Sequence, residues 1–270
     1  MKIGFLGGGN MASALIGGML ERGFPAANIR VVDLSDEGCA RLRERFGVHA
    51  GGAIDDAFLG CDLLVLAVKP QVLKAAVAPL AGRLTTQVVV SIAAGVRIAD
   101  MARWMSGYCR IVRAMPNTPA LIGAGVTGLF ADEAVDPAGR AAAVGVLEAV
   151  GSVVWVDTEA QIDTVTAISG SGPAYVFRFI EALEAAGRAR GFDEATARQL
   201  AIETVLGAAR LAQGSDEGPA ALRERVTSKG GTTAAALASF EADGFMDVVA
   251  RAVAAAEARG RELGEELGRD

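Results

Sequence analysis

Short apolar runs alternate with helical periodicity over the first 157 positions of the chain. Short, mostly apolar runs without alternation, typical of strands buried on both faces, occur at residues 3–6, 29–32, 63–68, 88–92 and 110–114. Between them, apolar residues recur with helical spacing at residues 11–22, 37–46 and 71–80. Two further strands, at 126–130 and 153–156, flank a helix at 137–150. This order predicts a parallel, doubly wound α/β sheet of the Rossmann type, covered by helices on both faces.

The pattern changes after Asp157, where strand-like runs stop. Helical periodicity continues through residues 174–189, 194–212, 219–225, 234–240 and 245–263. Asp193 and Thr232 have the residue types that cap helix N-termini. We therefore expect two domains, an α/β domain at residues 1–157 and an all-helical domain at residues 158–270.

Composition and charge exclude several functions. The net charge of −6 argues against nucleic acid as a partner, because an acidic chain gains nothing from neutralising phosphates. No apolar stretch of about 20 residues predicts a membrane span, and glycines interrupt the first apolar run too early for a signal peptide. Three widely spaced cysteines and one histidine predict no metal site. Such sparse cysteines fit a reducing compartment, so we expect a cytoplasmic protein.

The loop after the first predicted strand carries the strongest functional signal. Its sequence, GGGNMA at residues 7–12, matches a dinucleotide-binding fingerprint placed between a strand and a helix. Gly7 permits a tight turn, Gly9 leaves room for a pyrophosphate, and Ala12 lets the helix pack on the strand. The helix N-terminus offers N–H groups to the phosphates. The predicted cofactor contacts in this loop are Gly7, Gly9, Asn10, Met11 and Ala12.

Asp33 ends the second predicted strand, 21 positions after Ala12. A carboxylate in this place usually accepts hydrogen bonds from a ribose diol, which favours NADH. It would repel a 2′-phosphate unless Ser35 or Arg41 compensates. The alternative is that Asp33 only caps the following turn. The choice between NADPH and NADH therefore stays open.

Three later segments, at residues 67–70, 91–95 and 113–119, follow predicted strands. An open α/β sheet binds ligands at the carboxyl ends of its strands. Lys69 would neutralise a phosphate or orient a ribose, or is simply a solvated lysine. Asn117 would hold the nicotinamide carboxamide, or is a turn residue between two prolines. The cofactor contacts expected here are Ala67, Val68, Lys69, Pro70, Ala93, Ala94 and Asn117.

Two segments rich in glycine and hydroxyl groups lie beyond residue 157. One is SGSGPAY at residues 169–175, which we expect to be a loop running into a helix, and the other is VTSKGGTT at 226–233. Loops of this kind present N–H groups and hydroxyls to an anion such as a substrate carboxylate. The alternative is a capped turn between helices.

Together, the motifs GGGNM, VKP, SIAAG, RAMPNTP, SGSGPAY and SKGGTT closely resemble the pyrroline-5-carboxylate reductase family, over essentially the whole chain. The last two motifs are the specific ones. The resemblance implies reduction of L-Δ1-pyrroline-5-carboxylate to L-proline by NADPH or NADH, the final step of proline biosynthesis. It also implies a homodimer with intertwined helical domains, often assembled further into a decamer.

The resemblance also implies roles for residues of the second segment. Thr233 would face the ring nitrogen of the substrate and act as the catalytic residue. Two departures matter: Lys229 stands where many members have proline, and Gly218 stands where many have a histidine whose role cannot transfer. The implied substrate contacts are Ser228, Gly230, Gly231, Thr232 and Thr233.

Other functions remain possible on the residues alone. A hydroxyacid dehydrogenase usually needs a lysine or histidine base, and the helix starting AYVFR at residue 174 has no lysine there. A reductase of another cyclic imine acid, such as a six-membered ring acid, stays open, because pocket volume would decide and the sequence does not give it. A non-catalytic dinucleotide sensor would not need the segment at 228–233.

Overall fold

The computed structural model describes residues 1–269, so Asp270, which ends the predicted helical domain, lies outside the described residues. The chain forms two compact units. The sheet unit comprises Met1–Ser171 together with the end of the chain from Ala256, and the helical unit comprises Gly172–Ala255. This division follows contacts, whereas the predicted boundary at residue 157 follows the change from strands to helices.

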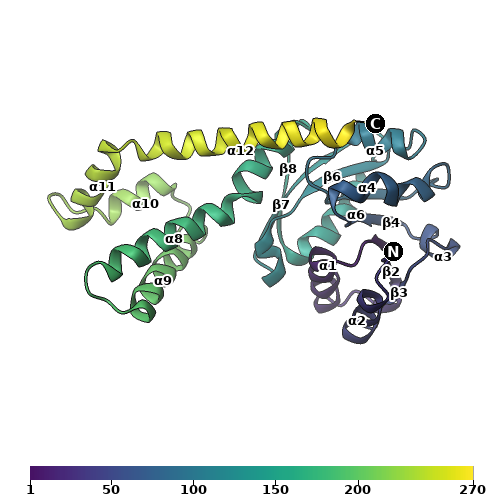
Figure 1. Cartoon of the computed structure of the whole chain (residues 1–270), viewed down its shortest axis with the longest axis horizontal. Coiled ribbons are helices and arrows are strands. Elements are labelled where there is room, and N and C mark those ends of the chain that lie inside the picture. The colour runs from purple at the N-terminus through teal and green to yellow at the C-terminus, as the bar shows by residue number, and fades with distance from the viewer. Residues whose placement is uncertain (270) are drawn as a thin grey trace. The chain divides into compact units, whose positions relative to one another are not determined.

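Within the described residues, the sheet unit contains an eight-stranded sheet (Figure 1). The strand order is β3 (His49–Gly51), β2 (Ile29–Val32), β1 (Ile3–Leu6), β4 (Leu63–Leu66), β5 (Val88–Ser91), β6 (Ile111–Met115), β7 (Gly125–Ala131), β8 (Gly151–Trp155). Neighbouring strands are parallel except β6 and β7, which are antiparallel. The prediction of a wholly parallel sheet is therefore wrong at β7. The connection at residues 116–124 is too short for a parallel crossover, which needs a dozen or more residues.

Both faces of the sheet are buried under helices, as predicted for a doubly wound fold. Alternate residues of one strand enter different cores: Ile3 and Phe5 enter the first, and Leu6 enters the second. The first core includes residues of α1 (Asn10–Glu21), α2 (Asp36–Phe46) and α6 (Pro137–Leu147). The second includes residues of α3 (Asp56–Leu59), α4 (Pro70–Val77) and α5 (Ile98–Trp104).

From Gln161 on, the segment after β8 is almost entirely helical. It comprises α7 (Gln161–Val165), the π-helical turn η5 (Thr166–Gly170), and then α8 (Gly172–Arg188). The prediction of a loop is therefore wrong for Ser169 and Gly170, which lie in η5, whereas the predicted run into a helix is confirmed by α8. The hydroxyl of Ser169 donates to the Val165 carbonyl oxygen at 2.9 Å, and thus bonds back to the helix instead of breaking it. Single π turns within helices are frequent at functional sites.

A buried ion network joins α7 to the sheet. Arg113 of β6 is 2% exposed and donates to Asp163 Oδ1 at 2.7 Å and to Glu159 Oε1 at 3.3 Å. The same Glu159 oxygen accepts a hydrogen bond from the backbone N–H of Ile98 at 2.8 Å. These bonds explain why residues beyond the last strand pack with the sheet unit.

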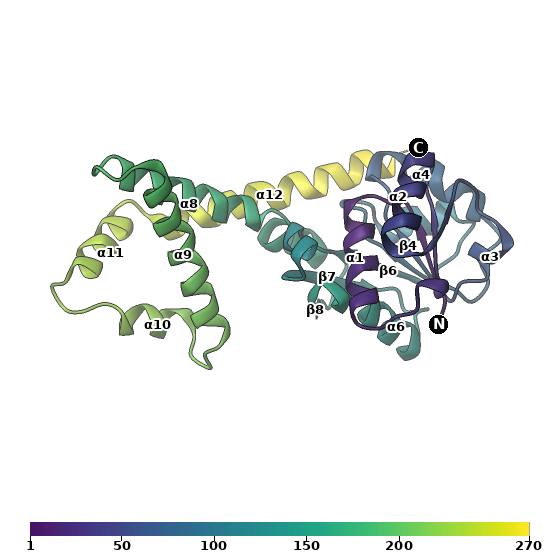
Figure 2. The same cartoon turned by 90° about the horizontal axis from the view of Figure 1, so that it is seen from below.

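The helical unit contains α8, α9 (Glu194–Gln213), α10 (Pro219–Arg225), α11 (Thr232–Ala242) and the first part of α12 (Phe245–Gly268) (Figures 1 and 2). No strand occurs between Val156 and residue 269, as predicted. The Asp193 cap is confirmed, because its carboxylate accepts from the N–H of Thr196 at 2.9 Å. Thr232 is not a cap. Gly231 takes that position, because α11 already begins at Thr232, one residue earlier than a Thr232 cap would require, after a turn bonded from Gly231 N–H to the Ser228 carbonyl oxygen at 3.0 Å.

Candidate functional site

The topology of the sheet creates a crevice at the carboxyl ends of β1 and β4. From β1 the chain moves outward to β2 and β3, then returns to the opposite side of β1 to form β4. Loops leaving β1 and β4 therefore diverge, and such a switch point is where open α/β sheets bind ligands. A cavity of about 660 Å³ opens there, with a wall made largely of apolar side chains. It is lined by Leu6, Gly7, Gly9, Val32, Asp33, Leu34, Gly52, Ile54, Ala67, Val68, Lys69, Val72, Ala75, Ala76 and Pro79.

The glycine loop has the geometry that its fingerprint predicts. Gly7 has φ +102°, and a Cβ there would lie 2.8 Å from the Ala67 carbonyl oxygen, so the loop touches the end of β4. A Cβ on Gly9 would meet nothing within 4 Å, so this glycine borders open space. Ala12 is fully buried against the sheet. The tight turn at Gly7, the open space at Gly9 and the close helix packing at Ala12 thus occur where the fingerprint predicts them.

The N-terminus of α1 begins at this loop. Its N-cap is Gly9, which offers no side-chain acceptor, and its first turn contains no acidic residue. The N–H groups and the positive end of the helix dipole are therefore directed at the open space beside Gly9. This arrangement suits a phosphate group. The predicted contacts Asn10 and Met11 lie in the same first turn.

Asp33 is already bonded to backbone groups. Its Oδ2 accepts from the N–H of Gly8 at 2.6 Å, and its Oδ1 accepts from the N–H of Ser35 at 2.8 Å. The second bond is the turn-capping alternative raised by the sequence. The first is unexpected, because it fastens the glycine loop to the end of β2. Contact of Asp33 with a ribose stays a prediction.

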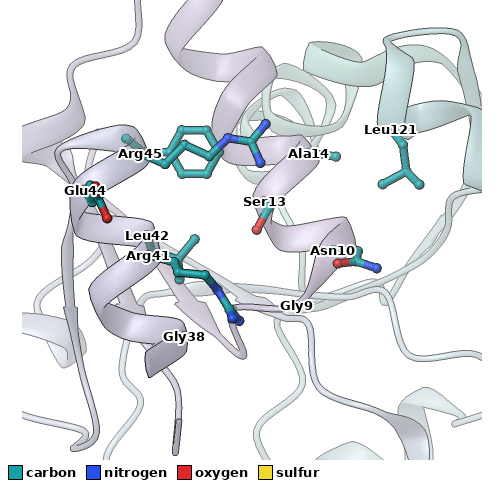
Figure 3. A pocket seen from close by; sticks show the side chains of 12 residues that line it. Gly9, Asn10, Ser13, Ala14, Gly38, Arg41, Leu42, Glu44, Arg45 and Leu121 are labelled. Atoms are coloured by element: carbon teal, nitrogen blue, oxygen red, sulfur yellow. The ribbon is translucent and has the colours of Figure 1, made fainter. Parts of the chain in front are cut away.

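The candidates for compensating a 2′-phosphate are also engaged. Ser35 is the N-cap of α2, and its Oγ accepts from the N–H of Gly38 at 3.0 Å. Arg41 lies 2.7 Å from the Glu37 carboxylate in an exposed ion pair. Figure 3 shows Arg41 facing a second cavity, of about 730 Å³, between α1 and α2.

The other predicted cofactor residues surround the first cavity or its neighbouring loops. Ala67, Val68 and Lys69 line it, and Lys69 is the exposed N-cap of α4, directly before Pro70. Ala93 and Ala94 lie on the loop after β5, with Ala93 buried and Ala94 exposed. The apolar wall was missed by sequence reasoning. Ile54 follows the short β3 that the pattern did not show, whereas the spacing of Val72 and Ala76 on one helix face was a usable signal.

The amide of Asn117 joins two segments of the sheet unit. Its Oδ1 accepts from the N–H of Val126 at 3.0 Å, and its Nδ2 donates to the Ser169 carbonyl at 3.2 Å. These bonds match the alternative of a structural turn residue and connect that turn to η5. One amide hydrogen is left over, so a role toward nicotinamide stays a prediction.

The predicted substrate segment lies in the helical unit, in the turn that leads into α11. Gly230 has φ +73°, a left-handed conformation that favours glycine. The N-terminus of α11 has no side-chain cap and no acidic residue in its first turn. Ser228 and Thr232 are exposed, and Thr233 is half-buried. Uncapped N–H groups beside hydroxyls favour an anion at this helix end.

Residues 1–269 contain no group of three histidine, cysteine or acidic side chains placed to hold a metal ion. Burial raises the pKa of the Cys61 thiol to about 11, so it stays protonated at neutral pH. Within the same residues, no helix combines the length and apolar character needed to span a membrane.

Comparison with known proteins matches both parts of the chain. Residues 159–263 match the family model "Pyrroline-5-carboxylate reductase dimerisation", and residues 2–95 match "NADP oxidoreductase coenzyme F420-dependent". The chain is 46% identical to the pyrroline-5-carboxylate reductase of Pseudomonas aeruginosa, over 99% of this chain and 98% of that protein.

Solved structures give the same picture. The pyrroline-5-carboxylate reductase of Coxiella burnetii superposes with a TM-score of 0.93 at 40% identity, covering 97% of this chain and 98% of that one. The pyrroline carboxylate reductase of Plasmodium falciparum, solved with NADP bound, gives 0.84 at 29% identity and covers 98% of each chain.

Proposed function

The chain belongs to the pyrroline-5-carboxylate reductase family, and from that premise we propose that it reduces L-Δ1-pyrroline-5-carboxylate to L-proline with NADPH or NADH. This reaction is the final step of proline biosynthesis. The observation that carries the proposal is the full-length similarity to reductases of that name, joined to a glycine loop with dinucleotide-binding geometry.

The cofactor proposal rests on the crevice between β1 and β4. Gly9 leaves open the space that a pyrophosphate needs, and the uncapped N-terminus of α1 supplies N–H groups to it. The apolar wall that includes Val72 and Ala76 suits an adenine ring. When bound, a reduced nicotinamide supplies a hydride to the imine carbon. The proposed cofactor contacts are Gly7, Gly9, Asn10, Met11, Ala12, Asp33, Ser35, Ala67, Val68, Lys69, Pro70, Ala93, Ala94 and Asn117.

The substrate proposal rests on the turn before α11. Uncapped N–H groups at this helix end bind the substrate carboxylate, and the charge of exposed Lys229 adds to their attraction. A cyclic imine accepts hydride readily when protonated, so the residues need to orient it more than to acidify it. The Thr233 hydroxyl forms a hydrogen bond with the ring nitrogen of the substrate. The proposed substrate contacts are Ser228, Gly230, Gly231, Thr232 and Thr233.

The test is turnover of Δ1-pyrroline-5-carboxylate by the purified protein, followed by the absorbance of NADPH or NADH. We expect turnover with at least one cofactor, and none with either rejects the proposal. The Thr233→Ala variant should lose at least about 10-fold in kcat/KM, equivalent to about 1.4 kcal/mol of transition-state binding. Thr204→Ala, a threonine of α9 outside the proposed site, is the matched control. Equal kinetics for the two variants remove Thr233 from the catalytic role.

Cofactor preference is tested at Asp33. If its carboxylate binds a ribose diol, Asp33→Ala raises the KM for NADH more than that for NADPH. If it only fastens the glycine loop through Gly8, both values rise together. The comparison also shows which cofactor the native protein prefers.

The helical unit supports a homodimer. Large apolar side chains such as Phe177 and Met246 are exposed there, at 62% and 77%. A second copy of this unit would cover them, and the matched dimerisation family model lies over the same helices. We extend the proposal to intertwined helical domains, spanning residues 158–270, and to assembly of dimers into a decamer. The mass in solution tests this, and a monomeric mass contradicts it.

The unpaired cysteines Cys39, Cys61 and Cys109 support a reducing compartment, so we assign the protein to the cytoplasm.

A reductase for a six-membered cyclic imine acid is the nearest alternative. It is favoured if that substrate gives the higher kcat/KM in the same assay.

A further inference from the structure

The C-terminal end of α12 lies in very close contact with the loop that follows β5. Both segments belong to the sheet unit. Gly264 is the buried residue of α12, and a Cβ on it would lie 2.8 Å from the carbonyl oxygen of Gly95. Gly95 has φ +81°, and its own Cβ would lie 3.3 Å from Leu267. The two backbones therefore touch at a point where neither residue has room for a side chain.

Other contacts hold α12 in this place. The hydroxyl of Thr164 in α7 donates a hydrogen bond to Glu257 Oε1 in α12 at 2.5 Å. Arg103 of α5 donates to the carbonyl oxygen of Gly268 at 2.7 Å. Leu267 packs against the second core of the sheet. The end of α12 is thus fastened on both sides of Gly264, and cannot easily move away from the loop.

The loop is also held by the end of β5. Ser91, the last residue of β5, is fully buried, and its Oγ accepts from the N–H of Ala93 at 3.4 Å. Ala93 is buried and Ala94 exposed, so the loop presents Ala94 at the carboxyl edge of the sheet. A loop held between a buried serine and a helix backbone has its position set by both.

We propose that Gly264 is a positioning residue for the dinucleotide. By letting the α12 backbone lie directly on the Gly95 carbonyl, it sets the position of Ala93 and Ala94. The inference rests on the proposed function, in which these two alanines contact the cofactor. A side chain at position 264 has backbone as its neighbour, so the loop must shift by some tenths of an ångström to admit it.

The test is the Kd of NADPH and of NADH for the full-length protein, measured by nicotinamide fluorescence without substrate, well below the melting temperature. Gly264→Ala should weaken binding of the preferred cofactor about threefold or more, since small displacements of binding groups have large effects. Gly260→Ala is the matched control, one helical turn earlier, where a Cβ meets nothing within 4 Å. It should leave the Kd unchanged and raise the melting temperature, because alanine favours a helix.

A second variant guards against failure of Gly264→Ala to fold. Leu267→Ala removes the side chain that abuts Gly95 without adding bulk, and should also weaken dinucleotide binding, by about twofold. In turnover, both variants should raise the KM for the dinucleotide while keeping the KM for the imine. A purely structural role lowers the melting temperature and leaves these constants unchanged.

The outcomes separate this inference from the proposed function. Native Kd values in folded Gly264→Ala and Leu267→Ala overturn the positioning role, even if the imine is reduced normally. A protein that binds the dinucleotide but does not reduce the imine overturns the proposed reaction, while the Kd comparison still decides the role of Gly264. A native protein that binds neither cofactor overturns both.

Discussion

The sheet unit and the helical unit differ in how far they bury their own apolar residues. In the sheet unit, the strands β1, β4 and β5 are buried along their whole length, and two cores flank them. In the helical unit, the buried residues of the long α9 are two alanines, Ala197 and Ala201, while Phe177 and Met246 are exposed. The sheet unit buries its apolar residues within a single chain, and the helical unit leaves large apolar residues on its surface.

The difference shows where stability and assembly reside. The free energy of unfolding of the sheet unit depends on its own core packing. The helical unit has apolar surface that a single copy does not bury, so its stability should depend on association and hence on protein concentration.

The largest effect is expected from the core of the sheet unit. Phe5 is fully buried in the first core, so Phe5→Ala should lower the free energy of unfolding by about 3–5 kcal/mol. Urea titration monitored by circular dichroism measures it. The loss should be the same at low and high protein concentration. A loss that depends strongly on concentration would mean that this core, too, relies on a partner.

Next is the buried ion network that attaches α7 to the sheet. Arg113→Met leaves the carboxylate of Asp163 buried without its partner and should cost about 3 kcal/mol in the same titration. Arg198→Met is the control in the helical unit, because the Arg198 side chain is 55% exposed in its pairs with Glu184 and Glu194, whereas Arg113 is buried. That variant should unfold at nearly the native urea concentration. Equal losses would contradict the difference in burial between the two networks.

Association should respond to a charge on the helical surface. Phe177→Asp should raise the dimer Kd at least about 10-fold, about 1.4 kcal/mol, because it places a carboxylate in apolar surface. Ile122→Asp is the control, a residue of the sheet unit that is 82% exposed. Sedimentation velocity over a dilution series measures both. An unchanged dimer in Phe177→Asp would move the interface away from this residue.

The smallest effect concerns the acidic helix caps, one in each unit. Backbone hydrogen bonds from Gly139 and Thr196 hold the pKa values of Asp136 and Asp193 below their usual range. Because the folded-state pKa is lowered, each cap stabilises the fold above the ordinary aspartate pKa, about 3.9, and loses this effect as the pH falls through the lowered value.

Aspartate-to-asparagine variants test these caps, because asparagine caps a helix without titrating. Urea midpoints between pH 7 and pH 3 should fall less steeply for Asp136→Asn and Asp193→Asn than for the native protein. If the urea midpoints of the variants and of the native protein fell equally with pH, protonation of the two caps would not contribute to the pH dependence of stability.

Much of the sheet unit was predictable from residue pattern. The bounds of β1 and β2 agree with the predicted strands, because strands covered on both faces leave a short, mostly apolar run without alternation. The glycine loop was predictable because each of its residues has a local requirement, such as the left-handed φ of Gly7. β3 was missed because three residues, one of them glycine, give too short a signal.

The sequence by itself therefore determined the fold class, the helical second half and the dinucleotide fingerprint, since these follow from periodicity and from backbone requirements of neighbouring residues. Only the tertiary structure decided the reversed direction of β7, the bond from Gly8 to Asp33 and the contact of Gly264 with Gly95. Each of these depends on which distant segments meet, and a single sequence records the types of those residues but not their pairing.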